Sequence, residues 1–284
     1  MAGLRLHGTL SGQRQIGENR MNETVVIAMP ALLAYALILI LPVAIFRHLK
    51  LRLTKELLIA MVRMAVQLGL VALYLEYIFR LDNLAVNAAW VLVMIVVATA
   101  SILRQGGLSW QKCLWTMLPA QLLTSILVLT GFLLLFDFAT LTSARYLVPL
   151  MGMVLGNILR SNVVALDRFF SELRAGEDIH IQYLTLGASP SEAIRPFLRN
   201  AFRAAVGPQL GTIATMGIVS LPGMMTGQIL GGSSPAVAIG YQIMIMIAIF
   251  TAATVSVFLA VHFARHIAFD DWGRIKPDIF IGRR

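Results

Sequence analysis

The stretch VAIGYQIMIMIAIFTAATVSVFLAVHF, residues 237–263, contains no Asp, Glu, Lys or Arg. A bilayer span requires roughly 20 predominantly apolar residues, because the hydrocarbon core is about 30 Å thick. In lipid, every backbone polar group must find its hydrogen-bond partner within the protein, so a single long apolar segment is expected to be a helix. The stretch therefore predicts a membrane-spanning helix.

The rest of the chain has the same apolar character. Of its 284 residues, 58% are hydrophobic and 13% are charged, whereas soluble domains contain about 25% charged residues. We expect an all-α fold, a polytopic membrane helix bundle with about seven transmembrane helices. The predicted spans are 24–46, 57–79, 84–103, 114–136, 146–166, 204–222 and 237–263.

The positions of the basic residues predict the orientation of the chain. Lys and Arg are concentrated in the first, third and fifth loops and in the C-terminal tail. Cytoplasmic loops are enriched in Lys and Arg, so the N-terminus is expected outside and the C-terminus in the cytoplasm. The net charge of +9 is explained by these loops, and we expect no nucleic-acid partner. Cys113 is the single cysteine, which excludes an intramolecular disulfide.

Three segments are expected along the chain. Residues 1–22 form a polar N-terminal extension, and a second methionine, Met21, stands near its end as a possible start site. Residues 23–266 form the transmembrane domain, and residues 267–284 form a basic cytoplasmic tail. The predicted location is the inner (plasma) membrane of the cell, as a multi-pass protein.

The fifth loop, 167–203, has the local signals of a helix–turn–helix element. Gly187 is placed to end one helix, because glycine enters the left-handed conformation at low cost. Ser189 and Glu192 have the spacing of a capping box, and Pro190 suits the first position of a helix. Downstream, Arg195, Arg199 and Arg203 are spaced by four on a face opposite apolar residues, and Pro196 is expected to split this helix. The alternatives are an interfacial helix on anionic lipid and an element that docks on a partner protein.

Several stretches of the sequence resemble a known family. LGASPSEA, residues 186–193, resembles the EAA-type loop of ABC-transporter membrane subunits, although Ile181 replaces its leading acidic residue. The wider chain resembles the FetB-type ABC permeases, bacterial iron exporters with plant relatives linked to aluminium tolerance. The resemblance rests on Arg63 and Gln67, PLMGMVLGN (149–157), LGASPSEA, GIVSLPGMMTGQI (217–229) and AIGYQIM (238–244), with departures at Arg160 and Pro196.

This resemblance implies a transport function driven by a separate subunit. The chain has no G-x-x-x-x-G-K-[ST] motif to hold ATP phosphates, so the chain itself is not expected to be an enzyme or to need a cofactor. The implied assembly is a permease homodimer with a separate ABC ATPase, and the implied cargo is a metal ion, iron by family. The ATPase-coupling residues would be Leu186, Gly187, Ala188, Ser189, Pro190 and Glu192.

Polar residues within the predicted spans are candidates for a transport pathway, because such groups are costly in lipid. Arg63 and Gln67 lie one turn apart in the second span, with snorkelling of Arg63 as the alternative. Asn157 is either a pathway residue or an interhelical hydrogen-bonding residue, and Gln242 is a weaker candidate. Gly152 and Gly156 form a GxxxG pattern that predicts close helix packing.

The stretch SLPGMMTGQILGG, residues 220–232, is predicted to form an external gate or pathway lining rather than a simple loop. Pro222 is expected to break the helix, and Gly223 and the later glycines permit tight turns. The side chains expected to face the route are Met224, Met225 and Gln228. No metal ligands can be assigned, since thioethers favour Cu(I) over iron. The pair His262 and His266 is more consistent with a juxtamembrane position than with a metal site.

Two other classes of protein are weighed against an ABC permease. An ion-coupled secondary transporter would need a carboxylate deep in a span, and no span has one at its centre. A membrane enzyme would need a catalytic constellation, and the spans contain no paired carboxylates and no Ser/His set. The identity of the solute and the direction of transport are not determined by the sequence.

Overall fold

The computed structural model describes residues 28–270, 276 and 279–280. The predicted extension 1–22 and most of the tail lie outside these residues. Every extended regular element within them is a helix, and the only β-type pairs are two isolated bridges, Leu108 with Phe280 and Met216 with Ser220. The all-α prediction is confirmed for this part of the chain.

Six helical segments in the described residues are long and apolar enough to cross a membrane. They are Met29–His48, Thr54–Leu81, Leu84–Gln105, Cys113–Phe132, Ala144–Ala175 and Pro235–Ala268. Each of these segments contains most of one predicted span. The first predicted span, 24–46, begins among residues that the structure does not describe. The described chain is thus a polytopic helical membrane protein.

The predicted span 204–222 is not among these six segments. Helix α11, Arg195–Thr215, begins in the basic loop and ends before the predicted span does. The break occurs at Met216, which is extended, and at Gly217, whose φ is +85°. The amide of Gly217 then donates to the carbonyl of Ser220 over 2.9 Å and closes a turn. Helix α11 contains three arginines besides its apolar residues and is not one of the six candidate spans. The predicted count of seven spans therefore stays a prediction.

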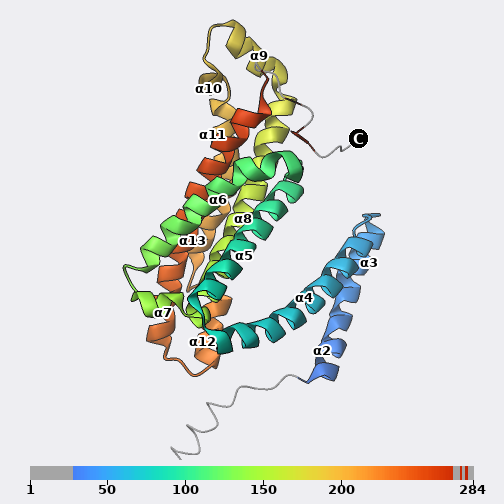
Figure 1. Cartoon of the computed structure of the whole chain (residues 1–284). Coiled ribbons are helices and arrows are strands. Elements are labelled where there is room, and N and C mark those ends of the chain that lie inside the picture. Colours follow the sequence, from blue (N-terminus) through green and yellow to red (C-terminus); the bar gives the residue numbers. More distant parts are fainter. Residues whose placement is uncertain (1–27, 271–275, 277–278, 281–284) are drawn as a thin grey trace, which may run out of the picture. The chain divides into compact units, whose positions relative to one another are not determined.

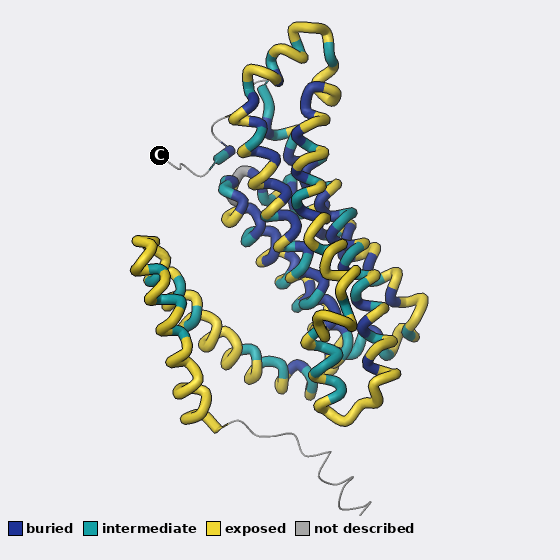
Figure 2. The backbone as a smooth tube through the Cα atoms, turned by 180° about the vertical axis from the view of Figure 1, so that it is seen from behind, coloured by how far each residue is buried: buried dark blue, intermediate teal, exposed yellow. Residues whose placement is uncertain are grey.

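The chain divides into two compact units. The first comprises residues 1–80 and 223–238. It includes α2 (Met29–Ala36), η1 (Leu37–Leu39), α3 (Ile40–His48), α4 (Thr54–Leu81) and α12 (Gly223–Leu230). Ile78 is the one buried residue in these elements, and Figure 2 shows α2 to α4 as largely exposed. Their apolar side chains are therefore available to lipid or to another chain.

The second unit comprises residues 81–222 and 239–284 and contains the buried core. Its elements include α5 (Leu84–Gln105), α6 (Trp110–Phe132), α7 (Phe138–Thr142), α8 (Ala144–Ala175), α11 and most of α13 (Pro235–Ala268). Helix α8 packs against both α5 and α11, as Figure 1 shows. Along α8, Met151, Val154, Ile158 and Phe169 are fully buried at helical spacing. Helix α8 is therefore the central helix of this unit.

A carboxylate clamp joins two turns at one end of the second unit. Asp82, in the turn before α5, accepts hydrogen bonds from the amide of Ala144 at 2.7 Å and the hydroxyl of Ser143 at 3.0 Å. The buried Asn87 donates to Asp82 over 3.3 Å and to the carbonyl of Thr142 over 2.9 Å. The bond from Ala144, with smaller contributions from Ser143 and Asn87, holds the pKa of Asp82 below its ordinary value. The turn before α5 is thereby tied to the start of α8.

The described part of the tail packs against the opposite end of this unit. The amide of Ser109 donates to the carbonyl of Ile279 over 2.7 Å. The guanidinium of Arg174 lies 3.6 Å from the centre of the Phe280 ring, in a cation–π contact. The segment at Ile279 and Phe280 is therefore bound to the turn between α5 and α6 and to α8.

Candidate functional site

The candidate site is the coupling element, which we define as residues 177–193. It consists of α9 (Glu177–Thr185), a turn at 186–189 and α10 (Pro190–Ala193). Helix α8 leads directly into it and extends to Ala175, well beyond the predicted end of that span at residue 166. Gly176 joins the two helices, and a Cβ there would stand 2.9 Å from Phe197. Only glycine allows this close approach between the start of α9 and α11.

The turn after α9 has the geometry that the sequence predicts. Gly187 has φ of +92°, and no heavy atom lies within 4 Å of a Cβ placed on it. Backbone conformation, and not crowding, is thus the reason for glycine here. The amides of Gly187 and Ala188 donate to the carbonyls of Leu184 and Tyr183 and close the end of α9. Leu186 is 85% exposed at the tip, an apolar side chain that nothing within the described chain covers.

The predicted capping box at the start of α10 is present. The amide of Ser189 donates to Glu192 Oε2 at 2.8 Å, and its hydroxyl donates to the same oxygen at 2.7 Å. In return, the amide of Glu192 donates to Ser189 Oγ at 3.4 Å. The hydroxyl and then the amide of Ser189 hold the pKa of Glu192 below its ordinary value. Pro190 occupies the first helical position, where its missing N–H costs nothing.

Helix α11 has the predicted amphipathic pattern. It begins at Arg195 with Pro196 near its start, so the helix is split from α10 as expected. Phe197 and Ala201 are buried, whereas Arg195, Arg199 and Arg203 are exposed. Helix α11 therefore presents a basic face that begins just after the coupling element.

Polar contacts attach the N-terminal part of α11 to α8. Glu172 on α8 accepts a hydrogen bond from Asn200 on α11 at 3.0 Å. The same carboxylate forms an ion pair with Arg168, with Nε 2.6 Å from Oε1. Such partly exposed pairs contribute little stability individually, and this one lies within α8, so the hydrogen bond from Asn200 is the contact that joins the two helices near the coupling element.

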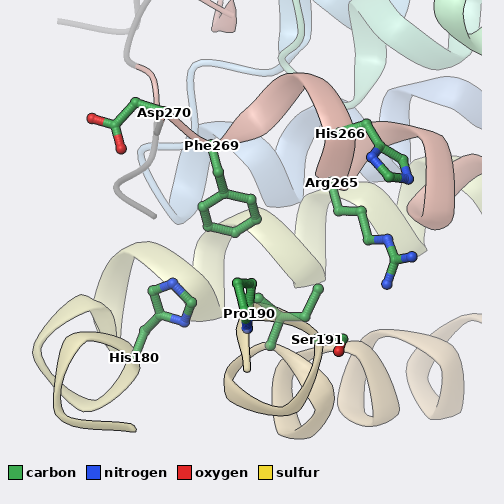
Figure 3. A pocket seen from close by; sticks show the side chains of 8 residues that line it. His180, Pro190, Ser191, Arg265, His266, Phe269 and Asp270 are labelled. Carbon is green, nitrogen blue, oxygen red and sulfur yellow. The ribbon is translucent and has the colours of Figure 1, made fainter. Parts of the chain in front are cut away.

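A cavity of about 420 Å³ lies between the coupling element and the end of α13, and Figure 3 shows its lining. His180 of α9 is 2% exposed, and its ring centre is 5.3 Å from that of Phe269 and 6.5 Å from that of Phe197. Pro190 and Ser191 of α10 form the facing wall, and Arg265 and His266 of α13 form another. The coupling element is thus packed on α13 as well as on α11.

The pathway residues predicted in the first unit lie on two helices. Arg63 and Gln67 are both exposed on α4. Met224, Met225 and Gln228 are half-buried on α12, which Gly223 begins, so the centre of the predicted gate is a short helix. Gln228 Oε1 is shielded from solvent and accepts no hydrogen bond from the described residues. The predicted gate function of these residues stays a prediction.

The remaining predicted residues lie in the second unit. Pro222 follows the turn after α11, seven residues beyond Thr215, at which that helix ends. Asn157 donates to the carbonyl of Met153 in its own helix over 2.8 Å, and not to a neighbouring helix. The buried Gln242 donates to the sulfur of Met216 over 3.8 Å. These residues do not form one cluster.

The two glycines of the GxxxG pattern differ in their surroundings. A Cβ on Gly152 would stand 3.4 Å from Met94 Cε of α5, whereas a Cβ on Gly156 would meet nothing within 4 Å. A side chain at Gly152 would thus meet α5 at an ordinary contact distance, and the predicted packing role of Gly152 stays a prediction. Gly156 has no such contact within the described chain.

A buried polar network is present that sequence reasoning did not assemble. Asn162 of α8 donates to Ser256 Oγ of α13 at 2.7 Å, and Ser256 donates to Gln121 Oε1 of α6 at 3.1 Å. The adjacent Ser161 accepts from Gln209 of α11 at 2.7 Å. Asn162, Ser256 and Gln121 are all essentially inaccessible to solvent. In the sequence, the polar pair Ser161–Asn162 within an apolar segment indicates that these side chains need hydrogen-bond partners. Their partners could not be identified from the sequence, because they lie far away along the chain.

No resident metal site can be built from the described residues. Nowhere among them do three or more His, Cys, Asp or Glu side chains come together in a way that could hold a metal ion. His262 and His266 have ring centres 5.1 Å apart on α13 without a third such ligand in that described region.

The helices, their apolar surfaces and the buried core together define a multi-pass α-helical membrane protein. Comparison with known proteins gives the family. Residues 29–269 match the family described as "Uncharacterised protein family (UPF0014)", and the chain belongs to it. The resemblance to the FetB-type family is confirmed by the relatives that share this similarity.

Three of these relatives come from distant organisms. The chain is 34% identical over 202 residues to UPF0014 membrane protein YjkA of Bacillus subtilis (strain 168), which covers 71% of this chain and 80% of that protein. It is 28% identical over 233 residues to the probable iron export permease protein FetB of Escherichia coli (strain K12), and the match covers 80% of this chain and 87% of that protein. It is 28% identical over 229 residues to Protein ALUMINUM SENSITIVE 3 of Arabidopsis thaliana, and the match covers 78% of this chain and 81% of that protein. No solved structure matches the chain.

Proposed function

We propose that the chain is the membrane-spanning permease subunit of an ABC transporter that exports a metal ion. The observation that carries this proposal is the coupling element, whose turn is closed by Gly187 and by the Ser189–Glu192 capping box. The element connects α8 to α11, and Leu186 is exposed at the tip of its turn. This arrangement suits insertion of the turn into a groove of a partner ATPase.

The element is built to transmit force into the membrane part of the chain. Helix α8 enters it directly from the core of the second unit, and α11 leads from it back to the same core. The contact between Glu172 and Asn200 and the bond between Ser161 and Gln209 tie these helices at two levels. Closure of an ATPase dimer would move α8 and α11 together. Such docking would stabilise one conformation of the permease over another, as any switching mechanism requires.

The energy source would be a separate polypeptide. The chain lacks a P-loop motif, so ATP hydrolysis would take place in two ABC ATPase subunits bound to a permease homodimer. The exposed apolar faces of α2, α3 and α4 offer surface for lipid and for a second permease copy. The location would be the inner (plasma) membrane of the cell.

Iron is the proposed cargo because the related FetB protein is named as a probable iron export permease. The route would pass the polar or flexible residues of the transmembrane part. These are Arg63, Gln67, Asn157, Pro222, Gly223, Met224, Met225, Gln228 and Gln242. Passage without a resident site agrees with the absence of a metal-ligand cluster among the described residues.

A second candidate is an ion-coupled secondary transporter that works without an ATPase. The exposed Arg63, the tenth of the 28 residues of α4, favours some handling of charge within the membrane. The acidic residues of the described membrane-crossing helices, however, lie toward the helix ends, as Glu56 and Glu76 do in α4. The coupling element also has no role in such a transporter.

Affinity purification tests the docking directly. The tagged full-length chain would be co-expressed with a P-loop ATPase encoded beside it, and the recovered ATPase would be quantified. We expect a stoichiometric complex that Gly187→Pro abolishes, while the variant still inserts into the membrane. Unchanged recovery of the ATPase with Gly187→Pro would contradict docking at this turn.

A further inference from the structure

The cavity behind the coupling element has two basic side chains on one side. Arg265 and His266 form one wall, and neither has an ion-pair partner among the residues that the structure describes. The one carboxylate in the lining, Asp270, lies on the opposite side of the cavity from Arg265 and His266, as Figure 3 shows. The side of the cavity nearest Arg265 is therefore suited to an anion.

The other walls provide shape and polar contacts. Ser191 is exposed on α10, and its hydroxyl, which lies 3.2 Å from Ser189 Oγ, would donate to an anion by turning away from Ser189. His180, Ile194 and Phe269 form a largely apolar base. A cavity of about 420 Å³ falls within the range of small-molecule sites, about 300–1,000 Å³, and is much larger than an inorganic phosphate ion needs. A larger group that carries a phosphate fits this lining better than a bare ion.

The position of the cavity indicates where such a group would come from. Arg265 and His266 lie in the last turn of α13, a candidate membrane span that ends at Ala268. Basic pockets between transmembrane helices at the cytoplasmic side are recognised sites for anionic lipid headgroups. With the predicted cytoplasmic C-terminus, the cavity would open at the level of the inner leaflet.

We propose that this cavity is a binding site for a phosphate-bearing anion, with Arg265 as its charged contact and with His266 and Ser191 as further hydrogen-bonding groups. Arg265 provides a planar guanidinium whose paired N–H groups match two phosphate oxygens. The source is the headgroup of an anionic phospholipid or a free phosphate compound. A bound anion bridges α13 to α10 and braces the coupling element from behind. This site differs from the exposed tip of the turn at Gly187 and does not depend on the proposed ATPase.

Two experiments separate the lipid source from the soluble source. The full-length chain is placed in nanodiscs of phosphatidylglycerol mixed with phosphatidylcholine, and co-purified lipid is counted by native mass spectrometry. In parallel, inorganic phosphate is added to the protein in phosphatidylcholine nanodiscs, and hydrogen exchange of residues 189–194 is measured. Retained phosphatidylglycerol identifies the lipid source, and slower exchange with phosphate alone identifies the soluble source.

Variants decide whether the cavity is the site. Arg265→Gln is expected to reduce anion retention about fivefold, because one basic residue near a lipid surface contributes about 1 kcal/mol. His266→Gln is expected to reduce it by less. Arg199→Gln is the matched control, since Arg199 is exposed on α11 but does not line the cavity. Equal losses for Arg265→Gln and Arg199→Gln would overturn the proposal, and so would the absence of both lipid retention and phosphate protection.

Discussion

Ser189 and Glu192 hold the first turn of α10 together by hydrogen bonds in both directions. The amide and hydroxyl of Ser189 donate to one oxygen of Glu192, at 2.8 and 2.7 Å, and the amide of Glu192 donates back to Ser189 Oγ. Removal of an N-cap hydroxyl costs about 0.5–2 kcal/mol. Helix α10 has only four residues, Pro190–Ala193, so this pair is a large part of what orders its first turn.

Ser189→Ala is accordingly expected to loosen the coupling element without unfolding the membrane core. Hydrogen exchange of residues 189–194 should accelerate about fivefold or more, the equivalent of about 1 kcal/mol. Thr185→Ala is a suitable control, because the Thr185 hydroxyl donates only to the Gln182 carbonyl within α9. If both variants exchange equally fast at 189–194, the capping box is not what orders α10.

Gly187→Ala is expected to weaken binding of the ATPase through backbone strain alone. A non-glycine residue at φ of +92° costs about 1–2 kcal/mol, and no side chain stands in the way. Gly107→Ala is the matched control, because Gly107 also has positive φ, +74°, and open space, but lies in the turn between α5 and α6. Both variants should lose similar stability, and only Gly187→Ala should lose affinity for the ATPase, as measured by biolayer interferometry. A similar loss of affinity for both would argue against a specific role for Gly187.

Asp82 is expected to make stability dependent on acid pH. Its pKa is lowered in the folded protein, chiefly by the amide of Ala144. The stabilisation is therefore complete above the pKa of the unfolded carboxyl and is lost as the pH falls through the folded pKa. Asp82→Asn tolerates the positive φ of 35° at this position, so it removes the charge with little backbone strain.

Thermal unfolding measured across the acid range tests this clamp. The wild-type melting temperature should fall as the pH is lowered, and Asp82→Asn should start lower and vary less with pH. Asp137→Asn provides a comparison, since the bonds of Asp137 to Thr140 are confined to the start of α7. A pH dependence for Asp137→Asn that is as flat as that of Asp82→Asn, or flatter, would contradict the clamp.

Asn162 and Ser256 should be energetically coupled across α8 and α13. They share a buried hydrogen bond of 2.7 Å, and interhelical bonds in membrane proteins contribute about 0.6 kcal/mol on average and about 1.7 at most. A double-mutant cycle with Asn162→Ala and Ser256→Ala, followed by steric trapping, should give coupling in this range. Pairing Asn162→Ala with Thr254→Ala should give none, because the Thr254 hydroxyl donates to Phe250 in its own helix.

The residues that the sequence located correctly are those whose roles are local. Gly187, Ser189 and Glu192 lie within six residues of one another, and their turn and cap chemistry appears directly in the sequence. The long apolar runs likewise predict helices, because lipid permits little else. Asp82 with Ala144 and Asn162 with Ser256 could not be predicted, since they join residues far apart along the chain. The sequence predicts that the sixth span ends at Pro222, because proline is a conspicuous helix breaker. Helix α11 ends earlier, at Thr215, and the turn begins at Met216 and Gly217.

Transport in reconstituted liposomes tests the central claim most directly. The chain would be incorporated with and without its ATPase, and ATP turnover and metal movement would be followed for iron and for a panel of other metal ions. The proposed function predicts metal movement that requires both ATP and the ATPase, and ATP turnover that the cargo metal stimulates. Metal movement at the same rate without the ATPase would contradict it.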